Sequence, residues 1–157
     1  MNSWKRWIGT MLTCLVLACP LVSRANMGAE DSTESTDPNA IDGKKAIEAK
    51  DWKRAVELFS KAAAADPKNA DVQNWLGFAQ RKSGNLTAAF AAYNEALKLN
   101  PQHRAAHEYI GEAYLQTGEV GKAEQHLAEL QKLCTPIPCE EYKDLRRALD
   151  EYKKKKK

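Results

Sequence analysis

The sequence predicts an all-α fold, a right-handed α-solenoid of three helical hairpins followed by a capping helix. The main observation is a constant repeat period, which relates Gly43, Gly77 and Gly111; Ala55, Ala89 and Ala123; Phe59, Tyr93 and Leu127; Ala62, Ala96 and Leu130; and Pro67 and Pro101. Self-similarity at a spacing of about 34 residues is typical of helical repeat proteins. A composition rich in Ala, Lys, Glu and Leu also favours helices.

The first 25 residues are predicted to be a signal peptide. Lys5 and Arg6 precede an uncharged apolar stretch over residues 7–22, and Ser23-Arg24-Ala25 supplies small residues for cleavage. This stretch is short for a membrane span of about 20 residues, so a retained anchor is the less favoured alternative. Lipidation at Cys19 is a second alternative. The expected location is therefore outside the cytoplasm, in the periplasm.

Charge is distributed unevenly along the chain. The sequence contains 24 Lys and Arg against 21 Asp and Glu, and removal of residues 1–25 leaves 21 of each. Without the lysine tail, residues 153–157, the remaining body has 16 cations and 21 anions. An acidic body argues against a nucleic-acid-binding surface. Residues 26–36 are polar and acidic with few large apolar groups, which predicts a disordered leader.

Turn residues divide the repeat region into units 36–69, 70–103 and 104–135. Gly84 and Gly118 are expected to end helices in the left-handed conformation. Pro67 and Pro101 keep the residues before them out of helical geometry. These signals predict helices near residues 38–50, 53–65, 71–83, 87–99, 105–117 and 121–133.

The helices of each hairpin are expected to cross closely at small residues. We expect the glycines of the repeat to face the alanines of the partner helix, with an aromatic residue or Leu beside them. Residues 136–152 are predicted to form the cap, as a helix over 139–152. Its apolar residues recur at helical spacing and form one stripe: Tyr142, Leu145, Ala148, Leu149 and Tyr152. Such a stripe covers the exposed end of a solenoid.

Residues 36–135 resemble the tetratricopeptide repeat family. The best copy contains Leu76-Gly77, Gly84-Asn85-Leu86, Ala89, Tyr93, Ala96-Leu97 and Asn100-Pro101, and the third contains Ile110-Gly111, Tyr114, Gly118-Glu119, Ala123 and Leu127. The first copy is weaker, with Asp42 and Ala46 where Leu and an aromatic residue are expected. The resemblance implies that the first helix of each unit lines a groove for a partner peptide.

The resemblance places the groove on specific side chains. They are Lys44, Ile47 and Glu48 in the first unit, Asn74, Phe78, Arg81 and Lys82 in the second, and Glu108, Glu112, Leu115 and Gln116 in the third. Phe78 and Leu115 are expected to be exposed apolar contacts. Some family members bind terminal carboxylates through a clamp of Lys, Asn and Arg. Trp75, Ala105 and Tyr109 stand at clamp positions here, which disfavours that mode of binding.

Cys134 and Cys139 are predicted to form a structural disulfide. A close, even pair of cysteines in an exported chain favours one bond, and residues 134–145 also resemble the tail of small exported bacterial tetratricopeptide proteins. A catalytic dithiol is less favoured, because the spacing is not Cys-x-x-Cys. A metal site with His126, or one on His103 and His107, lacks further ligands.

The sequence contains no motif for catalysis or for a cofactor, so we predict a protein that is not an enzyme. The favoured function is an adaptor or assembly factor of the bacterial envelope that binds a protein or peptide partner in the groove. The alternative is a surface-associated structural protein whose lysine tail contacts anionic membrane, at about 1 kcal/mol per Lys. A redox role is the weakest hypothesis.

Overall fold

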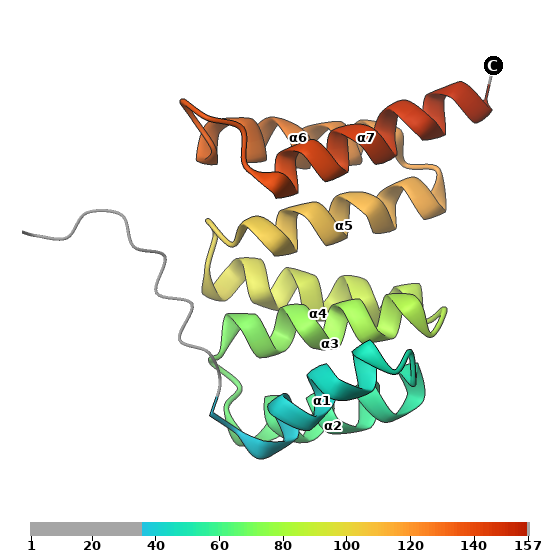
Figure 1. Ribbon diagram of the computed structural model, residues 1–157. Helices are drawn as coiled ribbons and strands as arrows, with labels where there is room; N and C mark the ends of the chain where they lie inside the picture. The colour runs from blue at the N-terminus through green and yellow to red at the C-terminus, as the bar shows by residue number, and fades with distance from the viewer. Residues whose placement is uncertain (1–35, 157) are drawn as a thin grey trace, which may run out of the picture. The chain divides into compact units, whose positions relative to one another are not determined.

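The computed structural model describes residues 36–156. The predicted signal peptide, almost all of the predicted leader and Lys157 lie outside the described residues. Within that range the chain forms α1 (Pro38–Glu48), α2 (Trp52–Ala65), α3 (Ala70–Lys82), α4 (Leu86–Leu99), α5 (Arg104–Thr117), α6 (Val120–Leu133) and α7 (Glu140–Lys155). Consecutive helices pack as hairpins (Figure 1). The predicted all-α hairpin fold is therefore confirmed.

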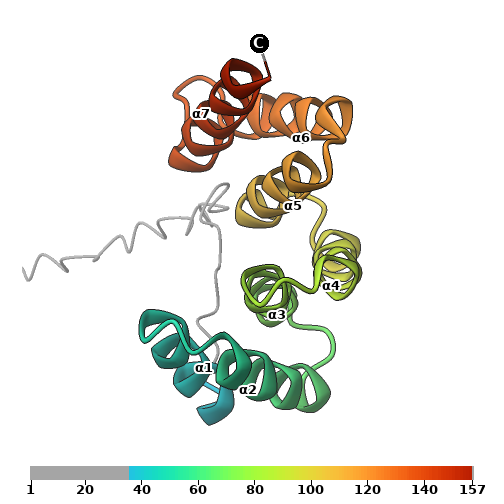
Figure 2. The same cartoon turned by 90° about the vertical axis from the view of Figure 1, so that its right-hand side faces the viewer.

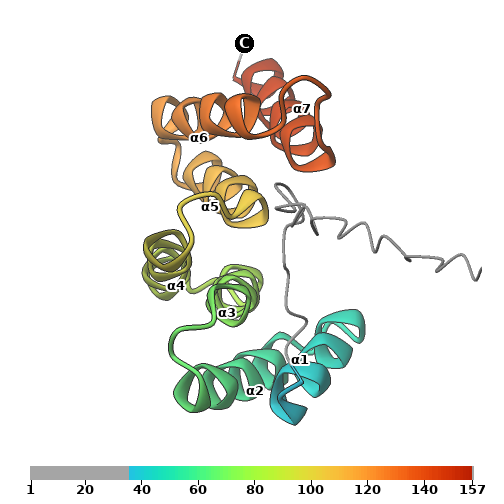
Figure 3. The ribbon, with the colours of Figure 1, turned by 90° about the vertical axis from the view of Figure 1, so that its left-hand side faces the viewer.

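The first helices of the hairpins lie together on one side of the stack. Figures 2 and 3 show α1, α3, α5 and α7 on one side and α4 and α6 on the other. Helix α5 packs against α4, α6 and α7, so it lies at the centre of the second half of the stack. Helices α3, α5 and α7 therefore contribute to the same side of the stack.

The turns form where the sequence predicts them. Gly84 has φ +89° and Gly118 has φ +81°, so both adopt the left-handed conformation that suits glycine. Asp51 caps α2 and Asn85 caps α4, because their side-chain oxygens accept from the backbone N–H of Arg54 (3.0 Å) and Ala88 (3.2 Å). These caps fix where α2 and α4 start.

An aromatic ring lies directly over the glycine in each of the first two repeats. A Cβ atom added at Gly77 would stand 2.6 Å from carbons of the Tyr93 ring, and one at Gly43 would stand 2.8 Å from Phe59. The prediction that alanine faces glycine is wrong in this respect, although Ala55 and Ala89 are fully buried nearby. The absent glycine side chain is thus what makes room for the ring.

The third repeat fills the same space with a residue from the cap. A Cβ atom at Gly111 would stand 2.6 Å from the Leu145 side chain of α7. Leu145 stands one repeat period after Gly111, so α7 has the register of the first helix of a fourth unit. Leu145 is fully buried and Leu149 is 3% exposed, in one apolar cluster with Leu115 and Leu130. Helix α7 therefore covers the end of the third repeat, as the apolar stripe predicts.

The end of α7 continues into the lysine run. The helix includes Lys153 to Lys155, and the Lys153 Nζ atom lies 2.6 Å from a carboxylate oxygen of Glu124 on α6. The Lys156 ammonium lies 5.7 Å from the centre of the Tyr152 ring. None of the helices in the described range is both long and apolar enough to cross a membrane.

A disulfide joins the third repeat to the cap. Cys134 ends α6 and Cys139 precedes α7, and their sulfur atoms are bonded at 1.98 Å. The bond closes a short loop that carries Ile137, which is 78% exposed. The predicted pairing is present in the structure. Closing a loop of this length stabilises a fold by about 2 kcal/mol on the chain-entropy model.

Two histidines pair inside the third hairpin. The Nδ1 atoms of His107 on α5 and His126 on α6 lie 2.9 Å apart, and His107 Nε2 lies 3.0 Å from the carbonyl oxygen of Pro101. A carbonyl only accepts, so His107 donates from Nε2 and, when neutral, accepts at Nδ1 from His126. Protonating both rings would place two N–H groups against each other.

The histidine pair makes stability depend on acidity. Burial, and then the neighbouring His107, lowers the pKa of His126 from 6.5 to about 4, while Glu129 acts in the opposite direction. The unfolded chain binds this proton more readily, so stability is lost as the pH falls from about 6.5 to about 4. After allowance for solvent screening, we expect the free energy of unfolding to fall by about 2 kcal/mol over this range.

Urea unfolding at several pH values measures this loss. His126→Asn keeps an N–H near the His107 ring but does not titrate, so its stability is expected to fall less steeply in acid. The carboxylates titrate equally in both proteins. The difference between the two stability profiles therefore reports His126 alone. Parallel acid profiles for the two proteins would contradict the assignment.

Candidate peptide-binding groove

The predicted groove residues lie on the first helices, but they differ in exposure. Lys82, Gln116 and Glu48 are exposed, and Lys44, Ile47, Phe78 and Glu112 are half-buried. Asn74, Arg81, Glu108 and Leu115 are buried. The expectation that Leu115 is an exposed contact is wrong, because α7 covers it and leaves it 6% exposed. Phe78 keeps part of its surface open to a partner.

Three aromatic side chains, Trp75, Phe78 and Tyr109, form what we call the aromatic shelf. The ring centres of Phe78 and Tyr109 lie 5.0 Å apart, and those of Trp75 and Phe78 lie 5.9 Å apart. All three residues are half-buried, and Trp52 of α2 meets Phe78 edge to face at 6.3 Å. Such a surface offers rigid apolar area for an incoming side chain.

Arg81 holds the shelf and the neighbouring helices together. Its Nη2 atom lies 2.7 Å from Glu112 Oε2 on α5, and its Nε donates to the hydroxyl of Tyr93 on α4 at 3.3 Å. Its guanidinium carbon lies 5.5 Å from the centre of the Phe78 ring and 5.7 Å from that of Tyr109. The cation is therefore engaged within the protein, which makes it part of the groove floor.

Four of the predicted groove residues line one open depression. Its volume is about 330 Å³, and its walls are Arg81, Glu112, Leu115 and Gln116 from α3 and α5 together with Ala148, Glu151, Tyr152 and Lys155 from α7. The sequence predicted the first wall but not the second. Helix α7 is thus both the cap of the solenoid and a side of the groove.

Several carboxyl groups lie close to Glu108 in the groove. Burial, and then the charges of Glu112, Asp144 and Glu141, raises the pKa of Glu108 to about 8, while Arg81 acts in the opposite direction. Burial, and then the nearby Glu108 and Glu112, raises the pKa of Tyr109 to about 12. These shifts reflect carboxylates gathered where α5 meets α7 in a partly dehydrated surface.

Sequence reasoning missed the shelf as a binding surface. The sequence pattern marks Trp75 and Tyr109 only as residues that replace the carboxylate clamp. They stand one repeat period apart and each comes just before the Leu-Gly or Ile-Gly pair of its repeat, so they occupy equivalent places on α3 and α5. That equivalence, together with the aromatic type, was the available signal.

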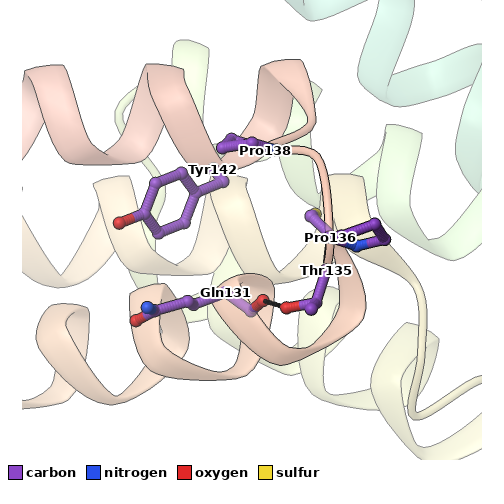
Figure 4. Close-up of a pocket in the computed structure, with 6 residues that line it drawn as sticks. Gln131, Thr135, Pro136, Pro138 and Tyr142 are labelled. Carbon is purple, nitrogen blue, oxygen red and sulfur yellow. Dashed lines mark hydrogen bonds between the residues drawn. The ribbon is translucent and has the colours of Figure 1, made fainter.

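A second, smaller cavity lies beside the disulfide. Its volume is about 140 Å³, and it is lined by Gln131, Cys134, Thr135, Pro136, Pro138 and Tyr142. Figure 4 shows these side chains and the hydrogen bond from Thr135 Oγ1 to the backbone oxygen of Gln131, at 2.7 Å. The lining contains no charged side chain, so this cavity offers no ion-pair partner to a charged ligand.

The described histidines serve the fold. His103 precedes α5 and its Nδ1 accepts from the backbone N–H of Ala106 at 3.2 Å, while its Nε2 lies 3.0 Å from Asp71. His107 and His126 pair with each other. Within residues 36–156, no group of three or more His, Cys, Asp or Glu side chains is placed to hold a metal ion.

Comparison with known proteins identifies the repeat. The sequence matches the tetratricopeptide repeat family over residues 43–102 and 79–136. It is 26% identical over 126 residues to the TPR repeat-containing thioredoxin TTL4 of Arabidopsis thaliana, a match that covers 80% of this chain and 17% of that protein. The chain therefore spans only a small part of this relative.

Solved structures share the arrangement of helices. MamA (MSR-1) superposes with a TM-score of 0.57 and 28% identity, covering 60% of this chain and 55% of the MamA chain. The first TPR of Spaghetti (RPAP3), bound to the HSP90 peptide SRMEEVD, gives a TM-score of 0.62 at 21% identity, covering 71% and 87% of the two chains. The similarity to RPAP3 shows only that the two chains share a fold. The family matches extend over more than half of the sequence, and the chain belongs to the tetratricopeptide repeat family.

Proposed function

We propose that this protein is a non-enzymatic adaptor or assembly factor of the bacterial envelope, which holds a segment of a partner protein between α3, α5 and α7. The observation that carries the proposal is the depression of about 330 Å³ beside the half-buried aromatic shelf. A side chain that enters the depression meets Leu115, Gln116 and Tyr152, while a neighbouring side chain of the same segment can rest against Phe78 of the shelf. An apolar anchor with a polar rim is the usual composition of a binding surface.

The expected setting and partner class rest on other features. The predicted signal peptide over residues 1–25 supports an envelope location. RPAP3 holds a peptide in its solved complex, which supports a peptide as the kind of partner for this fold. The mode of binding is expected to differ from a carboxylate clamp, because Trp75 and Tyr109 build the shelf at two clamp positions.

A groove variant tests this function. Arg81 and Leu115 are unsuitable for replacement because both are buried and support the fold. Phe78→Ala with Gln116→Arg instead removes half-buried apolar surface and places a long cation in the depression. Loss of an interface anchor of this kind costs about 2 kcal/mol, so we expect recovery of the partner by affinity capture to fall at least about ten-fold.

The control carries two changes on the second helices. Asn94→Ala on α4 and Gln125→Ala on α6 replace exposed residues on the other side of the stack. This variant is expected to recover the partner as well as the original protein does, and circular dichroism checks that both variants are folded. Equal recovery by the groove variant would remove the basis for the proposal.

A further inference from the structure

Carboxylates gather around Glu108 on the groove side of α5. Glu112 of the same helix and Glu141 and Asp144 of α7 are the charges that act on Glu108. Three of the four acids have a guanidinium partner. Arg81 lies 2.7 Å from Glu112, Arg147 lies 2.8 Å from Asp144 and Arg104 lies 3.7 Å from Glu141. Glu108 is 9% exposed, and none of these three arginines forms an ion pair with it.

Glu108 belongs to the same helix face as the walls of the depression. Glu112 and Leu115 follow it by four and seven residues, the spacing at which side chains share one face of an α-helix. Both of those residues line the depression of about 330 Å³. Glu108 therefore stands at the end of this groove, one helical turn from Glu112 and next in sequence to Tyr109 of the shelf.

A second acceptor without a partner stands at the equivalent place on α3. Asn74 precedes Glu108 by one repeat period and is 2% exposed. Its Oδ1 atom is buried and has no hydrogen-bond partner within residues 36–156. A buried polar atom left unpaired costs about 1–3 kcal/mol. Two adjacent first helices thus present acceptors in matching positions beside the shelf.

We propose that the segment held in the groove carries a lysine or arginine side chain that pairs with Glu108, next to an apolar residue that rests on the aromatic shelf. This inference rests on the proposed function and names the chemistry of its partner. The site fits a cation because Glu108 has no guanidinium partner within residues 36–156, and it opposes an acidic segment because an incoming carboxylate would meet the carboxylates of Glu112, Glu141 and Asp144.

Pairing of a cation with Glu108 is expected to change the protonation of its carboxyl group. The groups that face Glu108 are Arg81 on α3, Tyr109 and Glu112 on α5, and Glu141 and Asp144 on α7. With its pKa raised to about 8, Glu108 is mostly protonated near pH 7, and a partner cation favours the ionised form. Binding of a cationic segment is therefore expected to release a proton to the buffer, and affinity is expected to rise between pH 6 and about pH 8.

Synthetic peptides test the inference with the full-length chain. The probes are acetylated and amidated Gly-Ser peptides that differ only in a central pair: Leu-Lys, Leu-Arg, Leu-Gln or Leu-Glu. Binding is followed by tryptophan fluorescence, because Trp75 lies in the shelf. We expect the Lys and Arg peptides to bind at least ten-fold more tightly than the Gln peptide, and the Glu peptide to bind more weakly still.

Glu108→Gln is the matched variant, since it keeps the shape of the side chain and removes its charge. It is expected to lower the affinity for the Lys peptide about ten-fold, to leave the Gln peptide unchanged, and to abolish proton release in calorimetry across buffers. Glu95→Gln, a half-buried acid on α4, is the control and is expected to change none of these. Unchanged affinity in Glu108→Gln, equal binding of the Glu peptide, or no binding of any peptide would overturn the inference.

The outcomes separate this inference from the proposed function. Partner capture that depends on Phe78 and Gln116 but not on Glu108 would refute the cation alone. Capture that depends on none of the three would refute the groove itself. Self-association that is lost both in Glu108→Gln and on deleting residues 153–157 would instead identify the lysine run of a second copy as the occupant, and would overturn the external partner.

Discussion

Replacing Tyr93 by alanine is expected to lower the free energy of unfolding by about 4 kcal/mol, measured by urea denaturation. Tyr93 is fully buried, and its ring lies against Gly77 of the preceding helix. Its hydroxyl accepts from Arg81, which in turn pairs with Glu112. The change therefore leaves a cavity between α3 and α4 and frees the residue that links them to α5.

Three companion variants show that the contact with Gly77 is responsible. Gly77→Val places carbon atoms where the ring lies and is expected to cost about 1–3 kcal/mol through overpacking. In the double variant the missing ring leaves room for the valine, so the combined loss is expected to be smaller than the sum by about 1 kcal/mol or more. Tyr93→Phe is expected to cost only about 1 kcal/mol. Strictly additive losses would show that the two residues do not share the site.

Replacing Leu145 by alanine is expected to lower the free energy of unfolding by about 3 kcal/mol. Leu145 is fully buried and covers Gly111, as the aromatic rings cover the glycines of the first two repeats. Its loss weakens the attachment of α7 to α5. Because α7 also forms a wall of the depression, the variant is expected to bind a partner less well at temperatures where it is still folded.

The control for Leu145 lies on the same helix. Lys143 is exposed and forms a surface ion pair with Glu140 at 2.7 Å, so Lys143→Ala is expected to change stability by less than about 0.5 kcal/mol. Hydrogen exchange adds a local measurement, since the Leu145 variant is expected to lose protection first in α7. A variant as stable as the original protein would mean that α7 does not cap the repeats.

The fold could be predicted because its determinants are local or periodic. Gly84 and Gly118 set two of the turns, Asp51 and Asn85 cap α2 and α4, and the repeat period relates the units. The contact partner of each glycine could not be predicted in the same way. It depends on which side chain of a neighbouring helix projects into the space, and for Gly111 that side chain comes from outside the repeat.

The exposure of the candidate groove residues could not be predicted. The family resemblance assigned Arg81 and Leu115 to the groove, and in the structure both line the depression. Their burial results from long-range contacts, because Arg81 is held by Glu112 and Tyr93 and Leu115 is covered by α7. The residue pattern along one helix does not predict contacts with side chains of other helices. The second wall of the groove was missed for the same reason.

The central claim is that a partner segment lies between α3, α5 and α7. Site-specific photo-crosslinking in the source cells tests it most directly, with a photoreactive residue at Gln116 in the depression or at Gln125 on the exposed side of α6. We expect a crosslinked partner from position 116, at least about ten-fold more abundant than from position 125, and its loss when Phe78→Ala is added. Equal crosslinking from both positions, or none from position 116, would contradict the account.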